Sequence, residues 1–130
     1  MNEVYDFLGK AGTFYLATID EDKPRVRPFG AINIYKDRLY IQTGKVKKVF
    51  SQIEKNPYVE ICACTGSEWI RISGKLVVDD TLEAKTSMLE ANPMLKSMYR
   101  ADDDNTKVLY FENAEATFYS FAGEPKTIKF

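Results

Sequence analysis

The chain of 130 residues contains no histidine. This absence excludes nucleophilic catalysis by Ser-His-Asp or Cys-His groups, histidine-ligated haem, and almost every kind of catalytic zinc site. Cysteine is also scarce, and the two thiols, Cys62 and Cys64, cannot form a structural zinc site alone. Because they are two residues apart on a predicted strand, a disulfide between them would be strained. We therefore expect buried, free cysteines and no metal site.

Long apolar runs and a large charge of one sign are missing too. No stretch approaches the roughly 18 apolar residues that a membrane-spanning helix needs. The N-terminal segment MNEVYDFLGKAG lacks the basic-then-apolar layout of a signal peptide, so we expect a cytoplasmic protein without a membrane partner. A formal net charge of −1 differs from the broadly basic surface of general nucleic-acid binders, so no nucleic-acid partner is expected.

Aromatic residues, in contrast, are abundant: they make up 13% of the chain, with eight Tyr and eight Phe. Aromatic and β-branched side chains favour strands. The alternation of apolar and polar residues in INIYKDRLYIQT predicts a hairpin with its turn at Lys36 and Asp37. Strands are predicted over residues 13–19, 25–35, 38–43, 58–64, 69–78, 107–121 and 126–130.

Apolar residues spaced three and four apart predict the helices. One covers residues 3–9 and ends at Gly9, one covers 45–56, and one covers 79–93 with Asp80 as its N-cap. No repeat, low-complexity segment or linker interrupts the chain, so residues 1–130 are predicted to form a single domain. Strands in hairpin order with a few inserted helices predict a mainly β (α+β) fold, a closed or split β-barrel.

The stretch QTGKVKK, residues 42–48, places Lys45, Lys47 and Lys48 at the start of a predicted helix. A helix N-terminus attracts phosphate, whereas cations are mildly disfavoured there. A bound phosphate would therefore compensate the three lysines. The alternative is a solvated helix surface.

Arg25 and Arg27 lie two residues apart and share one face of a predicted strand. If the strand 38–43 pairs with theirs, both guanidinium groups approach the Thr43 hydroxyl and the lysines, an arrangement that suits bidentate phosphate recognition. The alternative is surface ion pairs with some of the 19 acidic residues. Trp69 begins a strand, and on sequence grounds alone we interpret it as a packing residue rather than a stacking platform for a ligand.

Three segments, KPRVRPF, YIQTGKVKKVFSQIEKNPYVEI and EWIRISGK, resemble in this order the FMN-binding split-barrel family related to pyridoxamine 5′-phosphate oxidase. The resemblance is to its small bacterial branch of general-stress and nitroimidazole-resistance-like proteins. It implies an antiparallel split β-barrel of six to seven strands with two to three helices, and a homodimer with FMN at the subunit interface. By matching position it implies that the following residues contact FMN: Arg25, Arg27, Pro28, Phe29, Gln42, Thr43, Lys45, Lys48 and Trp69.

Within this set, Arg27, Thr43 and Lys48 would anchor the phosphate, and Trp69 would pack against the flavin ring. Family resemblance implies the cofactor but not the reaction, and the substrate-binding histidine of the true oxidase is missing. We therefore expect a flavin-dependent oxidoreductase that passes a hydride or electrons between NADH or NADPH and a small acceptor, with no catalytic acid or base assigned. The alternatives are a non-catalytic flavin-binding module, acting as a redox sensor or flavin reservoir, and a deazaflavin binder.

Overall fold

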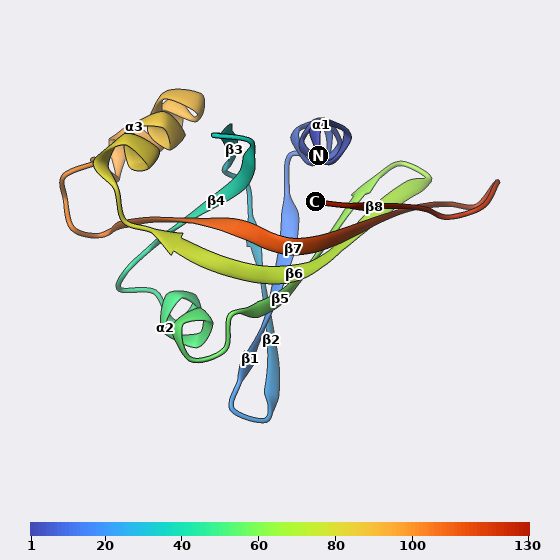
Figure 1. The fold of residues 1–130 in the computed structure, drawn as a ribbon, viewed down its shortest axis with the longest axis horizontal. Coiled ribbons are helices and arrows are strands. Elements are labelled where there is room, and N and C mark those ends of the chain that lie inside the picture. The colour runs from blue at the N-terminus through green and yellow to red at the C-terminus, as the bar shows by residue number, and fades with distance from the viewer.

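Eight strands form one antiparallel sheet in the order β2-β1-β5-β6-β7-β4-β3, with β8 paired to β7 (Figure 1). The computed structural model describes residues 1–130. The strands are β1 (Phe14–Asp20), β2 (Lys23–Phe29), β3 (Ile32–Tyr35), β4 (Arg38–Gly44), β5 (Tyr58–Thr65), β6 (Glu68–Asp79), β7 (Thr106–Ser120) and β8 (Lys126–Lys129). The helices are α1 (Asn2–Ala11), α2 (Lys48–Lys55), α3 (Leu82–Ala91) and the short 3₁₀ helix η1 (Pro93–Ser97).

The two edges of this sheet are joined by a very short connection. β2 and β3 lie at opposite ends of the strand order, yet only Gly30 and Ala31 separate them along the chain. The three Cα–Cα steps from Phe29 to Ile32 span at most about 11 Å, so the sheet must curl until its edges approach each other. Because β2 and β3 do not pair, the barrel is split, and the predicted mainly β fold is confirmed. It has eight strands instead of six to seven because the predicted strand 25–35 divides at this connection.

The predicted hairpin at Lys36 and Asp37 is confirmed. β3 pairs with β4 in a register that ends at Tyr35 and Arg38. Lys36 and Asp37 both have positive φ, 50° and 58°, as a two-residue type I′ turn requires. The turn thus sets which residues of β4 face the barrel.

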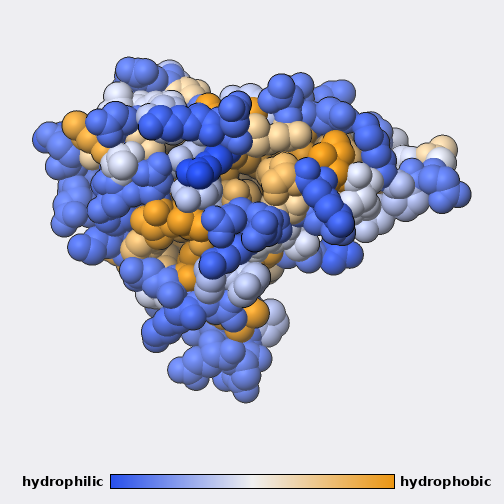
Figure 2. All heavy atoms as spheres, in the orientation of Figure 1, coloured by the Kyte–Doolittle hydropathy of each residue, from blue (hydrophilic) through white to orange (hydrophobic).

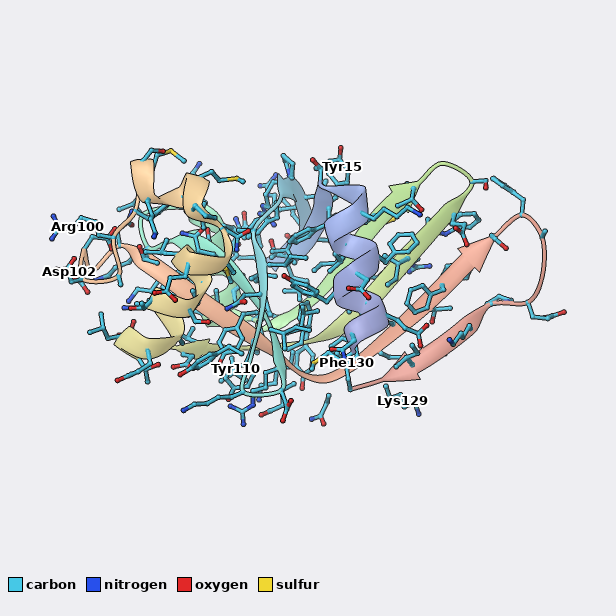
Figure 3. The ribbon with its side chains drawn as sticks, turned by 90° about the horizontal axis from the view of Figure 1, so that it is seen from above. Tyr15, Arg100, Asp102, Tyr110, Lys129 and Phe130 are labelled. Carbon is cyan, nitrogen blue, oxygen red and sulfur yellow. The ribbon has the colours of Figure 1, made fainter.

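Two helix boundaries differ from the prediction. α1, which lies across the barrel (Figure 3), continues through Gly9 and ends at Gly12, whose φ is 79°. The prediction of Gly9 as the stop is wrong, because the positive φ that ends the helix occurs at Gly12. α2 begins at Lys48 and not at residue 45, since Lys47 is the N-cap with extended backbone, φ −79° and ψ 143°.

The N-cap of α3 is Thr81, whose hydroxyl accepts a hydrogen bond from the Ala84 amide at 3.3 Å. The prediction of Asp80 as the cap is wrong, because the Asp80 carboxylate instead binds the ammonium groups of Lys85 and Lys107. This ion-pair cluster joins α3 to the sheet. None of the helices has the length and apolar composition that a membrane span requires.

Twenty buried apolar residues fill the barrel as one cluster. Ile61, Ile70 and Ile72 are completely buried within it, and each such side chain contributes roughly 1.5–3 kcal/mol of hydrophobic stabilisation. A smaller cluster beneath α3 contains Tyr40, Ala84, Met88 and Val108. The core therefore fixes the positions of the strands whose ends and edges form the site described below.

Both cysteines are free, as expected, but their burial was predicted wrongly. Cys64 is exposed and Cys62 is half-buried, because both lie on the outer face of the sheet. Each pairs there with a large polar or aromatic residue of β6, Cys62 with Arg71 and Cys64 with Trp69. The inner face of β5 is occupied instead by apolar residues such as Ile61.

Candidate functional site

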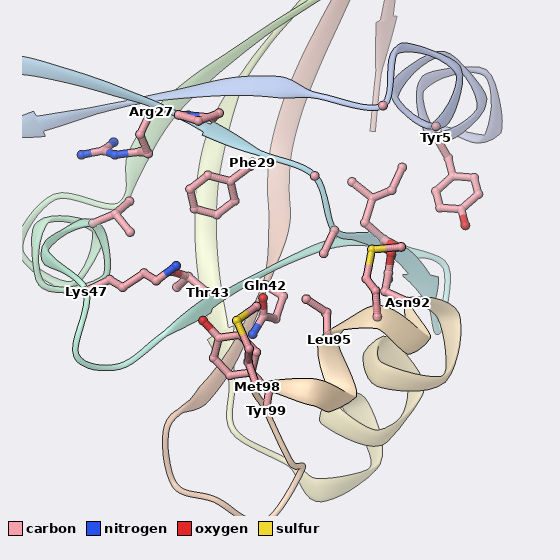
Figure 4. A pocket seen from close by; sticks show the side chains of 18 of the residues that line it. Tyr5, Arg27, Phe29, Gln42, Thr43, Lys47, Asn92, Leu95, Met98 and Tyr99 are labelled. Carbon is pink, nitrogen blue, oxygen red and sulfur yellow. The ribbon is translucent and has the colours of Figure 1, made fainter.

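A cavity of about 820 Å³ lies between α1, the β2–β3 connection, the β4–α2 segment and η1 (Figure 4). Its volume is within the range of small-molecule and cofactor sites, roughly 300–1,000 Å³. Figure 2 shows that apolar side chains on one face of the molecule gather in hollows between hydrophilic ones. Five of the residues predicted to contact FMN line the cavity: Arg27, Pro28, Phe29, Gln42 and Thr43.

Arg27 is held in place by neutral groups. Its Nη1 donates to the Thr18 hydroxyl at 2.7 Å and to the Leu16 carbonyl at 3.2 Å, and its Nη2 donates to Gln52 Oε1 at 2.7 Å. The Thr18 hydroxyl also donates to Gln52 Oε1, at 2.6 Å. Burial, together with the neighbouring Arg25 charge, lowers the pKa of Arg27. A cation fixed in this way without a carboxylate gains stability from an anionic ligand.

Lys47 supplies a second cation. It is the N-cap of α2, no side chain caps that helix, and its own side chain extends into the cavity (Figure 4). The ion pairs of the molecule involve neither Arg27, Lys47 nor Lys48. The helix N-terminus adds its unpaired N–H groups and positive dipole end. This end of the cavity therefore concentrates uncompensated positive charge.

Gln42 and Thr43 contribute two buried polar atoms that have no hydrogen-bond partner. Gln42 Nε2 and Thr43 Oγ1 are fully enclosed and unpaired, although the two residues are only 6% and 3% exposed. Leaving such a buried group unpaired costs about 1–3 kcal/mol. Both residues line the cavity, so a small movement of either side chain would bring its enclosed atom within reach of a polar ligand bound there.

The other predicted residues lie outside this cavity. Arg25 pairs with Asp20 at 3.2 Å and Lys45 pairs with Asp104 at 3.6 Å, both at the surface. Lys48 lines a separate, more polar hollow of about 460 Å³ between α2 and the β1–β2 turn. The strand pairing on which the approach of Arg27 to Thr43 was made conditional does not form, since β4 pairs with β3 and β7. Arg27 and Thr43 nevertheless line one cavity, because the barrel closes at the β2–β3 connection.

Trp69 packs in an aromatic cluster at the N-terminal end of β6. Its ring stacks on Tyr119 with centroids 5.3 Å apart and planes at 9°, and it contacts Phe121 at 5.4 Å. It does not line the cavity of its own chain. Its interpretation as a packing residue agrees with these contacts, whereas the expected contacts of Trp69, Arg25, Lys45 and Lys48 with FMN stay predictions.

The loop of residues 100–105 supports the turn that carries the lysines. Arg100 and Asp102 mark this loop beside η1 (Figure 3). The carbonyl of Asn105 accepts from the Lys45 amide at 2.7 Å, and its Oδ1 accepts from the Val46 amide at 3.3 Å. Burial alone would raise the pKa of Asp103, but hydrogen bonds from the backbone amides of residues 100, 105 and 106 outweigh it and lower the pKa to about 2.

We expect Asp103→Ala to lower the free energy of unfolding by about 1–2 kcal/mol, because it leaves those amides without an acceptor. The folded pKa of Asp103 lies below its unfolded value of about 3.9, so its contribution is fully present above about pH 4. It is lost as pH falls through the folded pKa of about 2. Urea denaturation at several pH values measures this. Equal acid dependence in wild type and variant would contradict the assignment.

Several lining residues were not in the predicted set of FMN contacts: Tyr5, Lys47, Asn92, Leu95, Met98 and Tyr99. Lys47 belonged to the lysine cluster for which a bound phosphate was considered, but it was not assigned a contact with FMN. The others come from α1 and from the segment after α3, and no local pattern connects these segments with residues 27–29 or 42–43. Only the barrel topology places them together.

Comparison with known proteins agrees with this geometry. Residues 1–120 match the family described as "Pyridoxamine 5′-phosphate oxidase". The chain belongs to this family. Family members are FMN-binding proteins, and the family's split-barrel fold is the one described above. A comparison with curated proteins gives no match.

Several solved structures are similar to this chain. A NimC/NimA family protein from Clostridium acetobutylicum is 46% identical over 100% of this chain and 92% of its own, with a TM-score of 0.98. General Stress Protein 26 from Bacillus anthracis is 20% identical over 99% and 97%, with a TM-score of 0.77. A pyridoxamine 5′-phosphate oxidase-related, FMN binding protein from Nostoc punctiforme is 16% identical over 99% and 95%, with a TM-score of 0.68. The last two similarities concern the fold.

Proposed function

We propose that this chain binds FMN in the cavity between α2 and η1 and acts, as a homodimer, as a flavin-dependent oxidoreductase. The observation that carries the proposal is the pair of buried, unpartnered atoms Gln42 Nε2 and Thr43 Oγ1 beside the uncompensated charges of Arg27 and Lys47. FMN matches this arrangement, because it joins a phosphate dianion and a polar ribityl chain to a flat ring. The lining of the cavity has cationic, polar and apolar parts that match the phosphate, the ribityl chain and the ring.

Different residues of the cavity would bind different parts of FMN. Arg27, Lys47 and the α2 N-terminus would hold the phosphate, since charge-assisted hydrogen bonds to phosphate are about twice as strong as neutral ones. Gln42 and Thr43 would pair with polar groups of the cofactor. Phe29 and the backbone of the β2–β3 connection would line the ring. When bound, FMN supplies the hydride and electron transfer, and the protein orients it.

The outer face of the sheet supports the homodimer. The strand registers place Pro28 beside Tyr15, and Tyr15 beside Cys62, on the face of the sheet that also carries Trp69 and Tyr119. Tyr15 is 50% exposed, and Pro28 also lines the cavity. A second copy packed on this face, which also carries the Arg71–Glu60 ion pair, would therefore border the cofactor cavity. Light scattering tests this, and a monomer that binds FMN tightly would overturn it.

The oxidoreductase proposal assigns two-electron transfer from a reduced nicotinamide to a small acceptor. Sustained NADH or NADPH oxidation by the FMN-loaded protein supports an enzyme. Stoichiometric binding without turnover supports the alternative, a non-catalytic flavin module. Mass spectrometry of the ligand released from purified protein separates FMN from a deazaflavin.

Thr43→Val is expected to have opposite effects on stability and binding. It replaces a buried, unpaired hydroxyl by a methyl group of the same shape, so the ligand-free protein should gain about 0.5–1 kcal/mol of stability. The same change removes a partner for the cofactor, and the dissociation constant for FMN should rise about tenfold. Thermal unfolding and calorimetric titration measure the two effects.

The control is Thr86→Val, because Thr86 is exposed on α3 and does not line the cavity. It should leave FMN binding unchanged. If Thr43→Val destabilises the ligand-free protein and leaves FMN affinity intact, the hydroxyl has a structural partner and does not serve the cofactor.

A further inference from the structure

Gln52 is the one polar residue on the buried face of α2. The other buried residues of this helix are Val49, Phe50 and Ile53, all apolar, and Gln52 itself is only 8% exposed. Burying an amide costs free energy unless its polar atoms form hydrogen bonds, and an apolar residue would fill this position without that requirement. The hydrogen bonds of Gln52 therefore indicate its role.

The Gln52 side chain binds Arg27 and Thr18 through a single oxygen atom. Its Oε1 accepts from Arg27 Nη2 at 2.7 Å and from the Thr18 hydroxyl at 2.6 Å. The Thr18 oxygen in turn accepts from Arg27 Nη1 at 2.7 Å, so the three side chains form a closed ring of hydrogen bonds. Because a guanidinium group can only donate, the amide must turn its oxygen toward Arg27. The ring ties β1, β2 and α2 together.

Gln52 acts on the cavity only through Arg27. Arg27 lines the cavity, whereas Gln52 and Thr18 do not, and Gln52 instead lines the separate hollow beside Lys48. The hydrogen bonds of the ring fix the orientation of the guanidinium group, and none of them neutralises its charge. A carboxylate in place of the amide would keep a hydrogen bond but supply a counterion, so the guanidinium group would gain less from an anionic ligand.

We propose that Gln52 is a positioning residue that determines the selectivity for a phosphorylated flavin, because it holds the Arg27 guanidinium group at the cavity without neutralising it. This inference rests on the proposed function, in that the FMN phosphate is the anion that Arg27 binds. Since Gln52 does not border the cavity, its replacement should change the difference in affinity between FMN and riboflavin, which lacks the phosphate, and leave the affinity for the ring unchanged.

Gln52→Glu tests the proposal, because glutamate has the shape of glutamine and adds a negative charge beside Arg27. By calorimetric titration, we expect the dissociation constant for FMN to rise about 30-fold and that for riboflavin to change less than about twofold. Gln52→Met removes a hydrogen bond of Arg27 without adding charge, and it should raise the dissociation constant for FMN only about fivefold. A parallel loss of affinity for both flavins, or unchanged FMN affinity in Gln52→Glu, would overturn the proposal.

The control is Ser51→Asp, which adds the same charge at the neighbouring position of α2, where the side chain is exposed and does not line the cavity. Its effect on FMN affinity should stay below about threefold. Thermal unfolding establishes that each variant is folded. A loss of FMN affinity in Ser51→Asp as large as in Gln52→Glu would mean that any negative charge on α2 weakens binding and that the contact with Arg27 is not the cause.

The NMR signals of the Arg27 guanidinium group test the positioning role without a flavin. A guanidinium group held against rotation gives separate signals for its two Nη groups, and we expect their exchange to be at least about threefold faster in Gln52→Met than in the wild type. Equal exchange rates would contradict the positioning role. If neither flavin binds the wild type, the proposed function fails, and inorganic phosphate replaces FMN in the titrations. Equal phosphate affinities of the wild type and Gln52→Glu would then overturn the role in selectivity.

Discussion

Replacing Arg27 by methionine is expected to raise the dissociation constant for FMN about 100-fold, the size of effect seen when one partner of a buried charge pair is removed. Arg27 is fixed by Thr18, Leu16 and Gln52, all of them neutral acceptors. Its charge therefore has no counterion in the protein, and burial lowers its pKa. Methionine keeps the apolar stem and removes only the guanidinium group.

Arg100→Met is the control. Arg100 is exposed, pairs with Asp102 at 3.0 Å and does not line the cavity. We expect its effect on FMN affinity to stay below about threefold, since exposed ion pairs contribute little. Calorimetry gives the affinities, and thermal unfolding separates loss of binding from loss of folding. Equal effects of the two substitutions would mean that the cationic end attracts phosphate by general charge and not through Arg27.

Asp80→Asn is expected to lower the free energy of unfolding by about 2–3 kcal/mol. One carboxylate oxygen of Asp80 binds the ammonium groups of Lys85 at 2.8 Å and Lys107 at 2.9 Å. Both lysine side chains are only 8% exposed, and Asp80 is 61% exposed. Removing the carboxylate leaves two buried cations without a counterion, and solvent at Asp80 moderates the effect.

The pH dependence of stability follows from the same contacts. Hydrogen bonds from Lys85 and Lys107 lower the pKa of Asp80 below its ordinary value. The stabilisation is thus present above the unfolded pKa of about 3.9, and it is lost as pH falls through the folded pKa. Asp80→Asn should remove this part of the acid dependence, as urea denaturation at pH 7 and at pH below 4 would measure.

Asp104→Asn is the control, because Asp104 is 83% exposed and pairs with Lys45 at 3.6 Å at the surface. Its effect should stay within about 0.5 kcal/mol. Adding Lys85→Met to Asp80→Asn should recover part of the lost stability by removing one of the buried charges. If Asp80→Asn behaves like the control, Lys85 and Lys107 must find water or another acceptor when Asp80 is replaced.

Most of the fold could be predicted because its signals are local. The alternation in INIYKDRLYIQT determines the β3–β4 hairpin, and the spacing of Val49, Phe50 and Ile53 identifies the buried face of α2. The ends of the helices were harder to predict from the sequence. Val46 continues the same apolar spacing but is 85% exposed, since the extended backbone of Lys47 starts the helix after it.

The cavity could be predicted only where its residues are neighbours in the sequence. Residues 27–29 and 42–43 belong to short motifs, and all five line it. Spacing could not separate Arg27 from Arg25, because both share one face and only the β1–β2 register brings Asp20 near Arg25. Tyr5, Asn92 and Met98 join the cavity through the curvature of the sheet, which no local pattern encodes.

The central claim is that the cavity recognises FMN through its phosphate, and a calorimetric comparison of FMN with riboflavin tests it most directly. The two ligands share the ring and the ribityl chain, and only FMN carries the phosphate that Arg27, Lys47 and the α2 N-terminus would bind. We predict that FMN binds about 100-fold more tightly than riboflavin. Equal affinities, or no binding of either flavin, would contradict the account.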